Sequence, residues 1–457
     1  MKRGRLILVA LVAAGTAPAA ISAGDGPVIT LSEAVRVARQ KNPSFLGQKE
    51  KLNQANEWKR KALALFLPQW SAAGTYTRFN KEVSFEMPDM NSFYFNPLAS
   101  PPFGFERSLE TAIQKENSFG ASTTLNLNLL NMSLFPRYAA VGAQVKAAEL
   151  STLAYENEFV YGVVSAYYAA LGARKILAIT RQGVTVAEAH FAAAKSRFEA
   201  GDAPKLALLR SEIELEKARQ DLRRAENGYS LAREALAVLL DRDAAFDVAD
   251  ADNVPGPATV GQGEAEAVRL AEDAVRLRPD VAAAEAAIAS AEKGKEEIWY
   301  RFLPTLQASG TLRYSDSLGF IGDDYQWFVT LTAVVSLYDG GIRYADLREK
   351  QSAIAESTLA LASVRSSIRG QVRQTMLEID TCGANIASAS KQVELARETH
   401  RVAKVNFDLG LASSSDVTDA NAALSNADLN LAREELNCQL GRLKLLKVLG
   451  TIREHYK

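Results

Sequence analysis

The feature that most constrains this chain is an internal repeat. Shifting the sequence by 236 residues, and by 209 in its later part, brings uncommon residues into register without a gap inside each aligned segment. The coincidences include Pro43 with Pro279, Phe66-Leu67-Pro68 with Phe302-Leu303-Pro304, Gly74 with Gly310, Phe198 with Phe407, and Gly201 with Gly410. Matches at Pro, Gly and Phe are hard to obtain by chance, so we divide the chain into two copies, 24–240 and 264–457. The Asp-rich segment 241–263, which contains Pro and Gly, is predicted to be the linker between them.

The N-terminus has the three-part layout of a secretory signal. A basic start precedes an apolar run over 6–14 and small residues that end at Ala23, with Ala19 as the alternative cleavage site. A transmembrane anchor would need about 20 apolar residues, which this run lacks. We therefore expect residues 1–23 to be a signal peptide. Because no cysteine lies near the cut, a lipid-anchored N-terminus is not expected.

Period-2 alternation of apolar and polar residues predicts four strands of about ten residues. The expected ranges are 69–79, 118–130, 305–315 and 326–337. An ordinary soluble sheet shows the same alternation as a membrane barrel, so the pattern alone leaves both open. The insert of the first copy, about 80–117, is aromatic-rich and is expected to be either a cap over a pore or a disordered surface loop.

Each copy also contains a long segment that no proline interrupts, about 136–200 and 342–409. Each can form one helix roughly 100 Å long at about 1.5 Å per residue. The returning segment carries apolar and small residues at spacings of three and four, which predicts antiparallel coiled-coil hairpins with tips at 198–204 and 407–413. A dimerisation stalk would show the same stripe.

Composition excludes several classes of protein. With 53 basic and 54 acidic residues, the chain is not a basic nucleic-acid scaffold. Its three histidines have no metal-ligand spacing, and no phosphate-binding glycine loop or nucleophile motif is present. We therefore expect no catalysis, no cofactor, no metal site and no nucleic-acid partner.

Four amphipathic strands cannot close a barrel alone, because unpaired edges in lipid leave backbone groups without hydrogen bonds. Closure needs about eight strands or more, so the protomer must oligomerise. Three copies would supply twelve strands, enclosing water, continued by a ring of twelve helices. The predicted fold is mainly α with a small β part: tandem coiled-coil hairpins forming a periplasmic tunnel beneath a trimeric 12-stranded transmembrane barrel.

The chain resembles the TolC-like outer-membrane efflux proteins, also called outer membrane factors, over essentially its whole mature length. Besides the repeat, the resemblance rests on the two Phe-Leu-Pro segments, on Leu337-Tyr338-Asp339-Gly340-Gly341-Ile342-Arg343, and on Phe407-Asp408-Leu409-Gly410-Leu411-Ala412. It implies a homotrimeric channel of a tripartite efflux or type I secretion system, located in the outer membrane and extending into the periplasm. It also implies a periplasmic adaptor and an inner-membrane pump as partners, and small molecules or polypeptides as cargo. The alternative from another class is a periplasmic coiled-coil scaffold or adaptor without a pore.

Asp416 and Asp419 are the candidate pore residues. They lie three residues apart at the start of a returning helix and share a face. Acidic residues there also serve as helix caps, so capping is the alternative role. In a trimer they would form two rings that favour cations, and the resemblance supports acidic residues at the periplasmic entrance. Since Ala207 and Arg210 occupy the matching positions, the first hairpin is expected to contribute no acid.

The hairpin tips are the candidate adaptor-docking sites. Their residues are Gly201, Asp202, Ala203, Gly410, Leu411, Ala412 and Ser413. Glycine is what any helix-to-helix turn requires, so its presence does not by itself indicate a partner.

Cys382 and Cys438 each lie 28 residues from Gly410, which places them at the same height in a symmetric hairpin. In an oxidising compartment they are candidates for a disulfide, provided that their Cα atoms come within about 7 Å. Two buried free thiols are the alternative.

Overall fold

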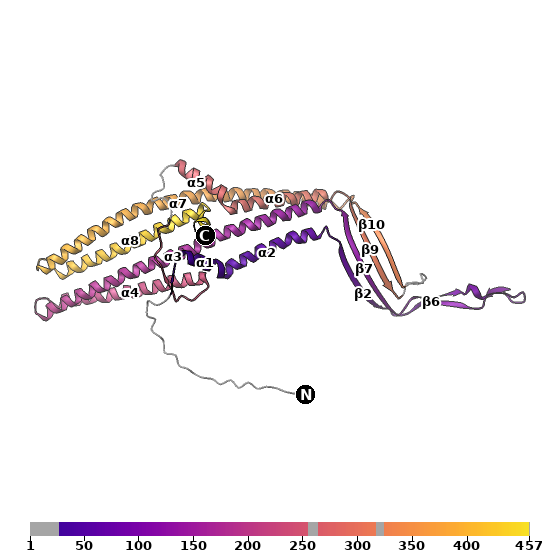
Figure 1. Ribbon diagram of the computed structural model, residues 1–457, viewed down its shortest axis with the longest axis horizontal. Coiled ribbons are helices and arrows are strands. Elements are labelled where there is room, and N and C mark those ends of the chain that lie inside the picture. Colours follow the sequence, from indigo (N-terminus) through magenta and orange to yellow (C-terminus); the bar gives the residue numbers. More distant parts are fainter. Residues whose placement is uncertain (1–26, 255–263, 317–323, 457) are drawn as a thin grey trace, which may run out of the picture. The chain divides into compact units, whose positions relative to one another are not determined.

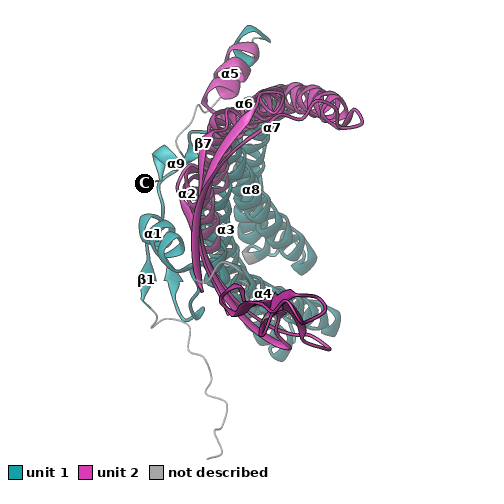
Figure 2. Ribbon diagram, turned by 90° about the vertical axis from the view of Figure 1, so that its right-hand side faces the viewer, with its two compact units in different colours: residues 1–46, 157–267, 372–457 teal, residues 47–156, 268–371 magenta. Residues whose placement is uncertain are grey.

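The computed structural model describes residues 27–254, 264–316 and 324–456. The predicted signal peptide lies outside these residues. The chain forms two compact units, which Figure 2 distinguishes by colour. Unit 1 comprises residues 1–46, 157–267 and 372–457, and unit 2 comprises 47–156 and 268–371. Two long helices, α3 (Leu134–Glu199) and α7 (Ile342–Asp408), contribute to both units.

Unit 2 contains a four-stranded antiparallel sheet in the order β10-β9-β7-β2 (Figure 1). The strands are β2 (Gln69–Arg78), β7 (Asn117–Leu130), β9 (Thr305–Ser315) and β10 (Tyr325–Val334). Each sequence copy supplies two strands, and β7 and β9 join the copies at the centre. β10 stops three residues before the predicted Leu337, because the backbone there turns toward α7 and the carbonyl of Ser336 accepts a bond from Arg343.

The register puts the apolar positions of all four strands on one face of the sheet. One row across the sheet consists of Trp70, Leu125, Gly310 and Val329, and the next consists of Ala72, Thr123, Leu312 and Trp327. The opposite face carries rows such as Ala73, Ser122, Arg313 and Gln326. Every residue of the two edge strands, β2 and β10, is exposed in the single chain. The sheet therefore has two different faces and two open edges.

The insert between β2 and β7 is more regular than a loop. β3 (Val83–Pro88) pairs with β6 (Ser108–Gln114), and β4 (Phe93–Phe95) pairs with β5 (Phe103–Phe105). A single 3-10 turn, η1 (Met90–Ser92), separates the two ladders. The expectation of a disordered surface loop was wrong for these residues, since their backbone groups pair with each other.

Two helices lead into the sheet at equivalent points of the repeat. They are α2 (Pro43–Ala64) and α6 (Pro279–Tyr300), and in both a proline occupies the first position, where its missing N–H is not needed. The phenylalanine of each Phe-Leu-Pro segment then packs on the helix that leaves the sheet. Phe66 contacts Phe135 at 5.4 Å between ring centroids, and Phe302 contacts Tyr344 at the same distance.

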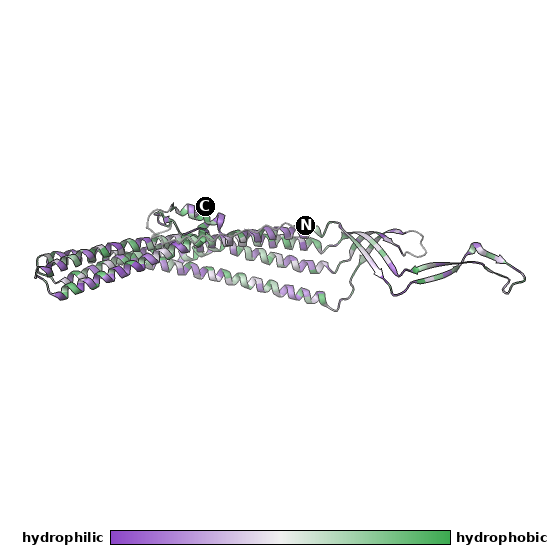
Figure 3. Ribbon diagram, turned by 90° about the horizontal axis from the view of Figure 1, so that it is seen from below, coloured by the Kyte–Doolittle hydropathy of each residue, from purple (hydrophilic) through white to green (hydrophobic). Residues whose placement is uncertain are grey.

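Unit 1 contains the tips of both helical hairpins and the parts of the helices next to them. α3 is followed by α4 (Lys205–Leu240), and α7 by α8 (Ser414–Val448). Figure 3 shows that these helices carry both hydrophilic and hydrophobic residues along their length. Part of the predicted stripe of α4 is buried, including Ser211, Leu215 and Leu236. None of the helices in the described ranges combines the length and the apolar composition needed to cross a membrane.

Short elements complete unit 1. They are β1 (Val28–Ile29), α1 (Leu31–Lys41), β8 (Asp247–Val248) and α9 (Ile452–His455), together with the first residues of α5 (Glu264–Leu277). The parallel pair β1 and β8 places part of the predicted linker against the N-terminal strand. The hydroxyl of Tyr167 in α3 lies 2.9 Å from Ile29 O and 2.8 Å from Ala249 O. Residues 241–254 are thus packed into unit 1, while 255–263 lie outside the described residues.

Candidate pore entrance at the hairpin tips

Both tips close with the same backbone motif. Gly201 has φ of 84° and Gly410 has φ of 75°, the left-handed region in which glycine has no Cβ to clash. The N–H of Asp202 donates to Arg197 O at 2.8 Å, and the N–H of Leu411 donates to Asn406 O at 2.7 Å. Each of these hydrogen bonds closes a six-residue turn and pairs a carbonyl at the end of α3 or α7. The predicted tip residues therefore occupy the two turns, and each turn is stabilised by a backbone hydrogen bond within its own hairpin.

The returning helices begin differently. Ser413 caps α8 and forms a capping box, in which a carboxylate oxygen of Asp416 accepts from both the N–H and the hydroxyl of Ser413 at 2.7 Å. α4 begins after Pro204, which provides no side-chain cap. The Ser413 hydroxyl and N–H lower the pKa of Asp416, so this exposed residue stays ionised. Asp416 thus has the capping role that the sequence left open, and its charge remains at the tip surface.

An acidic residue of the first hairpin, Glu214, interacts with Asp419 of the second. Burial raises the pKa of Glu214 in α4, Lys217 partly offsets this, and the charge of Asp419 in α8 raises it further. A raised pKa favours the uncharged form of Glu214, so the expectation that only the second hairpin supplies acids to the entrance stays a prediction. The repeat aligns Ala207 and Arg210 with the two aspartates, and Glu214 lies one helical turn beyond Arg210. The sequence could not select Glu214, because Glu212 and Glu216 flank it at the same spacing of two.

An aromatic and cationic contact joins the two hairpins near their tips. The guanidinium of Arg197 in α3 lies 4.0 Å from the ring centroid of Phe407 in α7. His190, two turns before Arg197, lies with its ring centroid 6.2 Å from that of Phe407. Burial lowers the pKa of His190, and its Nε2 atom is buried without a hydrogen-bond partner among the described residues. No spacing in the sequence indicates this cluster, because it joins α3 to α7.

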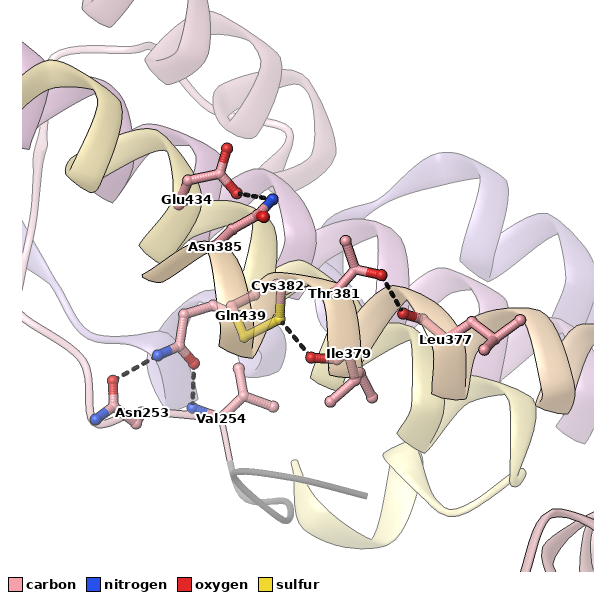
Figure 4. The surroundings of a disulfide bond; sticks show 10 residues. Asn253, Val254, Leu377, Ile379, Thr381, Cys382, Asn385, Glu434 and Gln439 are labelled. Carbon is pink, nitrogen blue, oxygen red and sulfur yellow. Dashed lines mark hydrogen bonds between the residues drawn. A yellow bond between two sulfur atoms is a disulfide. The ribbon is translucent and has the colours of Figure 1, made fainter. Parts of the chain in front are cut away.

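The two cysteines form a disulfide between α7 and α8 (Figure 4). The Cα atoms of Cys382 and Cys438 are 5.3 Å apart, within the limit of about 7 Å that a disulfide allows, and both side chains are buried. Next to Cys438, the Gln439 side chain accepts from the N–H of Val254 at 2.8 Å and donates to Asn253. The disulfide therefore joins α7 to α8 at the level where the residues that follow β8 pack against α8.

The two sequence copies thus appear in the structure as two pairs of strands in one sheet and two long helical hairpins. The sequence matches the outer membrane efflux protein family over residues 34–242 and 270–451, and the chain belongs to that family. It is mainly α with a small β part, as expected. The scaffold alternative finds no support in this match.

Individual relatives agree with the family. The chain is 24% identical to nodulation protein T of Rhizobium leguminosarum bv. trifolii over 356 residues, which cover 76% of this chain and 74% of the relative. It is 21% identical to outer membrane protein TolC of Vibrio cholerae over 357 residues, covering 76% and 80%. A membrane protein from Pseudomonas aeruginosa superposes with a TM-score of 0.73 at 21% identity, covering 96% of this chain and 99% of that one. The Campylobacter jejuni CmeC outer membrane channel gives 0.72 at 15%, covering 92% and 85%.

Proposed function

We propose that three copies of this chain form an outer-membrane efflux channel whose sheet closes into a 12-stranded barrel. The observation that carries this proposal is the sheet of unit 2, which has one apolar face, one polar face and two open edges. In lipid an open edge leaves backbone donors and acceptors unpaired, and pairing β10 with β2 of the next copy removes both edges. The apolar face then meets lipid and the polar face meets water.

The dimensions of the strands agree with this role. Ten residues at about 3.3 Å each, tilted by about 40°, span about 25 Å, the height of the apolar band of outer-membrane barrels. Near one end of the sheet, Tyr76 lies 4.9 Å from Phe119 and Tyr314 lies 5.1 Å from Tyr325, measured between ring centroids. Aromatic residues at this level form the girdles that anchor barrels at the membrane surface.

Export by the predicted signal peptide would deliver the chain to the periplasm, and its hairpins would form the tunnel there. The exposed side chains of Leu409 and Leu411 at the second tip would dock a periplasmic adaptor linked to an inner-membrane pump. Photo-crosslinking from position 411 in cells tests this docking. A heavier product that contains a periplasmic protein supports it, and the absence of any product contradicts it.

The acidic residues at the tips would make the entrance cation-selective. Asp416 and Asp419 together would place six carboxylates around the axis of a trimer, and like-charge crowding attracts counter-ions. The test is single-channel recording of the purified oligomer in a planar bilayer, comparing wild type with Asp416→Asn plus Asp419→Asn. The amide oxygen of asparagine at 416 can still accept from Ser413, so the charge is removed without removing the acceptor of the cap.

Cation-selective steps that lose selectivity in the double variant support both the channel and the position of the acids. The matched control is Asp202→Asn, which removes an acid from the other tip turn and is expected to retain selectivity. Steps that the double variant leaves unchanged would limit Asp416 to capping. A chain that neither conducts nor resists carbonate extraction from membranes would instead be a scaffold.

A further inference from the structure

The end of the insert between β2 and β7 carries an unusual apolar face. In the ladder of β4 and β5, Phe93 lies opposite Phe105 and Phe95 lies opposite Phe103. Side chains of directly paired residues lie on the same side of a sheet, and residues two apart share a face, so all four rings are on one side. We call these four residues the phenylalanine face. Tyr94 and Gly104 form the opposite side, where a Cβ at position 104 would lie 3.1 Å from the Tyr94 hydroxyl.

The phenylalanine face is not covered within the single chain. Its four side chains are between 39% and 68% exposed, and the ring centroids of Phe93 and Phe105 are 5.7 Å apart. Met90 and Leu98 beside it are exposed to 76% and 97%. Exposed apolar patches of this kind mark surfaces that contact another molecule.

Charge distinguishes between the surfaces that the phenylalanine face can meet. The segment from Met90 to Phe105 contains no ionisable acid or base, whereas the insert as a whole, 81–116, has six acidic and three basic side chains. An acidic hairpin is repelled by a surface of anionic lipid headgroups, which instead attracts basic segments. The phenylalanine face can meet another copy of itself, because all six acidic residues of the insert lie outside the uncharged segment 90–105.

The trimer, on which this inference rests, would bring three such faces to one rim. Twelve strands about 4.8 Å apart and tilted by about 40° enclose a barrel of roughly 12 Å radius. The six residues of β3 alone span about 20 Å at about 3.3 Å per residue. Each hairpin is therefore long enough to reach the threefold axis from the rim.

We propose that the phenylalanine faces of the three copies pack against one another over the outer mouth of the channel and narrow it. The contact is between identical apolar surfaces around the axis. It buries rings that are exposed in the single chain. Cargo leaving the barrel has to separate them.

Cysteine crosslinking of the full-length oligomer tests the contact. Phe95→Cys is expected to give covalent dimers under mild oxidation, because three thiols around one axis can form one pair at a time. The matched control is Tyr94→Cys, on the opposite side of the same strand, which should give at least about tenfold less dimer, since its side chain points away from the partner face. Equal crosslinking of the two variants would overturn the proposal.

Conductance is the independent measurement. Replacing Phe93, Phe95, Phe103 and Phe105 by Ser should increase the single-channel conductance about twofold or more, because a hydrophobic constriction is removed. A trimer that conducts, but in which neither crosslinking nor conductance distinguishes the variants, overturns this inference and leaves the channel intact. Absence of a trimer or of any conductance in the wild type contradicts the proposed function itself. If the Ser variant instead loses only its binding to lipopolysaccharide vesicles, the face binds lipid and the proposal is wrong.

Discussion

At the residue scale, His190 is a titratable group held in an environment that disfavours its charge. It lies near Phe407 and Arg197 at the tips, and burial lowers its pKa. The pKa of histidine in an unfolded chain is about 6.5, so below that pH the unfolded state binds more protons than the folded state. His190 therefore does not reduce the free energy of unfolding above about pH 6.5. As the pH drops below that value, the free energy of unfolding falls, because the buried histidine resists protonation.

His190→Gln should reduce the acid sensitivity of the tips. The variant has no titrating group at this position, so its melting temperature should fall less than that of wild type between pH 7.5 and pH 5. Differential scanning fluorimetry of the detergent-solubilised protein measures the difference. His400, whose pKa is lowered by burial and by Lys404, provides a second site at which His400→Gln should have the same direction of effect. An unchanged pH dependence in His190→Gln would contradict the assignment.

Arg343 is a second residue whose role depends on several contacts made at once. Its Nε atom donates to Asp339 at 2.6 Å and its Nη2 atom to Ser336 O at 2.8 Å, while the guanidinium lies 4.3 Å from the ring centroid of Phe302. It thereby connects the exit of β10 with the segment that leads into β9. Only a planar group with several donors can make these contacts together.

Arg343→Lys should destabilise this junction by about 2 kcal/mol, the usual contribution of one or two hydrogen bonds that involve a charged group. A lower melting temperature and a smaller yield of assembled oligomer are the expected results. The control is Arg301→Lys, since Arg301 is half-exposed and its pairs with Glu297 and Asp346 are worth at most about 1 kcal/mol. Equal loss in the two variants would show that Arg343 has no special role.

At the element scale, the second hairpin differs from the first by its disulfide and its capped tip. Cys382 and Cys438 are 56 residues apart in sequence, so the bond closes a long loop that includes the whole tip. Closing such a loop restricts the unfolded chain, and loop-entropy arguments assign roughly 4 kcal/mol to it. The first hairpin has no equivalent, since the sequence contains two cysteines in all.

Replacing both cysteines by Ala should therefore lower the melting temperature of the protein by an amount that reductant reproduces in wild type. Thiol alkylation followed by mass measurement verifies the starting state, because no label should be incorporated without reductant. Cys382→Ala alone gives the same loss of the bond and leaves one thiol available for labelling. Alkylation of untreated wild type would mean that the thiols are free.

At the scale of the whole molecule, assembly depends on which face of the sheet meets lipid. Ala72 and Ala73 are neighbours in β2 with the same side chain, but Ala72 lies in a row with Leu312 and Trp327, and Ala73 in a row with Ser122 and Arg313. The proposed trimer directs the first toward lipid and the second toward water. The same substitution at these two positions therefore measures the effect of the environment alone.

Ala72→Arg should reduce assembly strongly, because an arginine near the middle of the bilayer costs about 2–4 kcal/mol on the lipid face of a barrel. Ala73→Arg should assemble nearly as well as wild type, since its side chain would reach water. Light scattering of the detergent-purified protein measures the fraction with the mass of three chains. The reverse order of the two variants would contradict the assignment of the faces.

Local patterns in the sequence determined the elements of this protein. Period-2 alternation predicted the strands and uninterrupted helix-forming runs predicted α3 and α7, because both signals depend on residues a few positions apart. The repeat aligned Phe66-Leu67-Pro68 with Phe302-Leu303-Pro304, and in the structure each segment leads into a strand. The family followed from the same local motifs.

Contacts between distant segments were decided only by the tertiary structure. The electrostatic coupling of Glu214 to Asp419, the packing of His190 near Phe407, and the insertion of residues 241–254 beside β1 all join segments that no local spacing relates. The four phenylalanines became one face only when pairing set the register of β4 and β5, since a shift of one residue would have divided them between two sides. Sequence determines which residues can face the same way along one element, and tertiary pairing determines what they face.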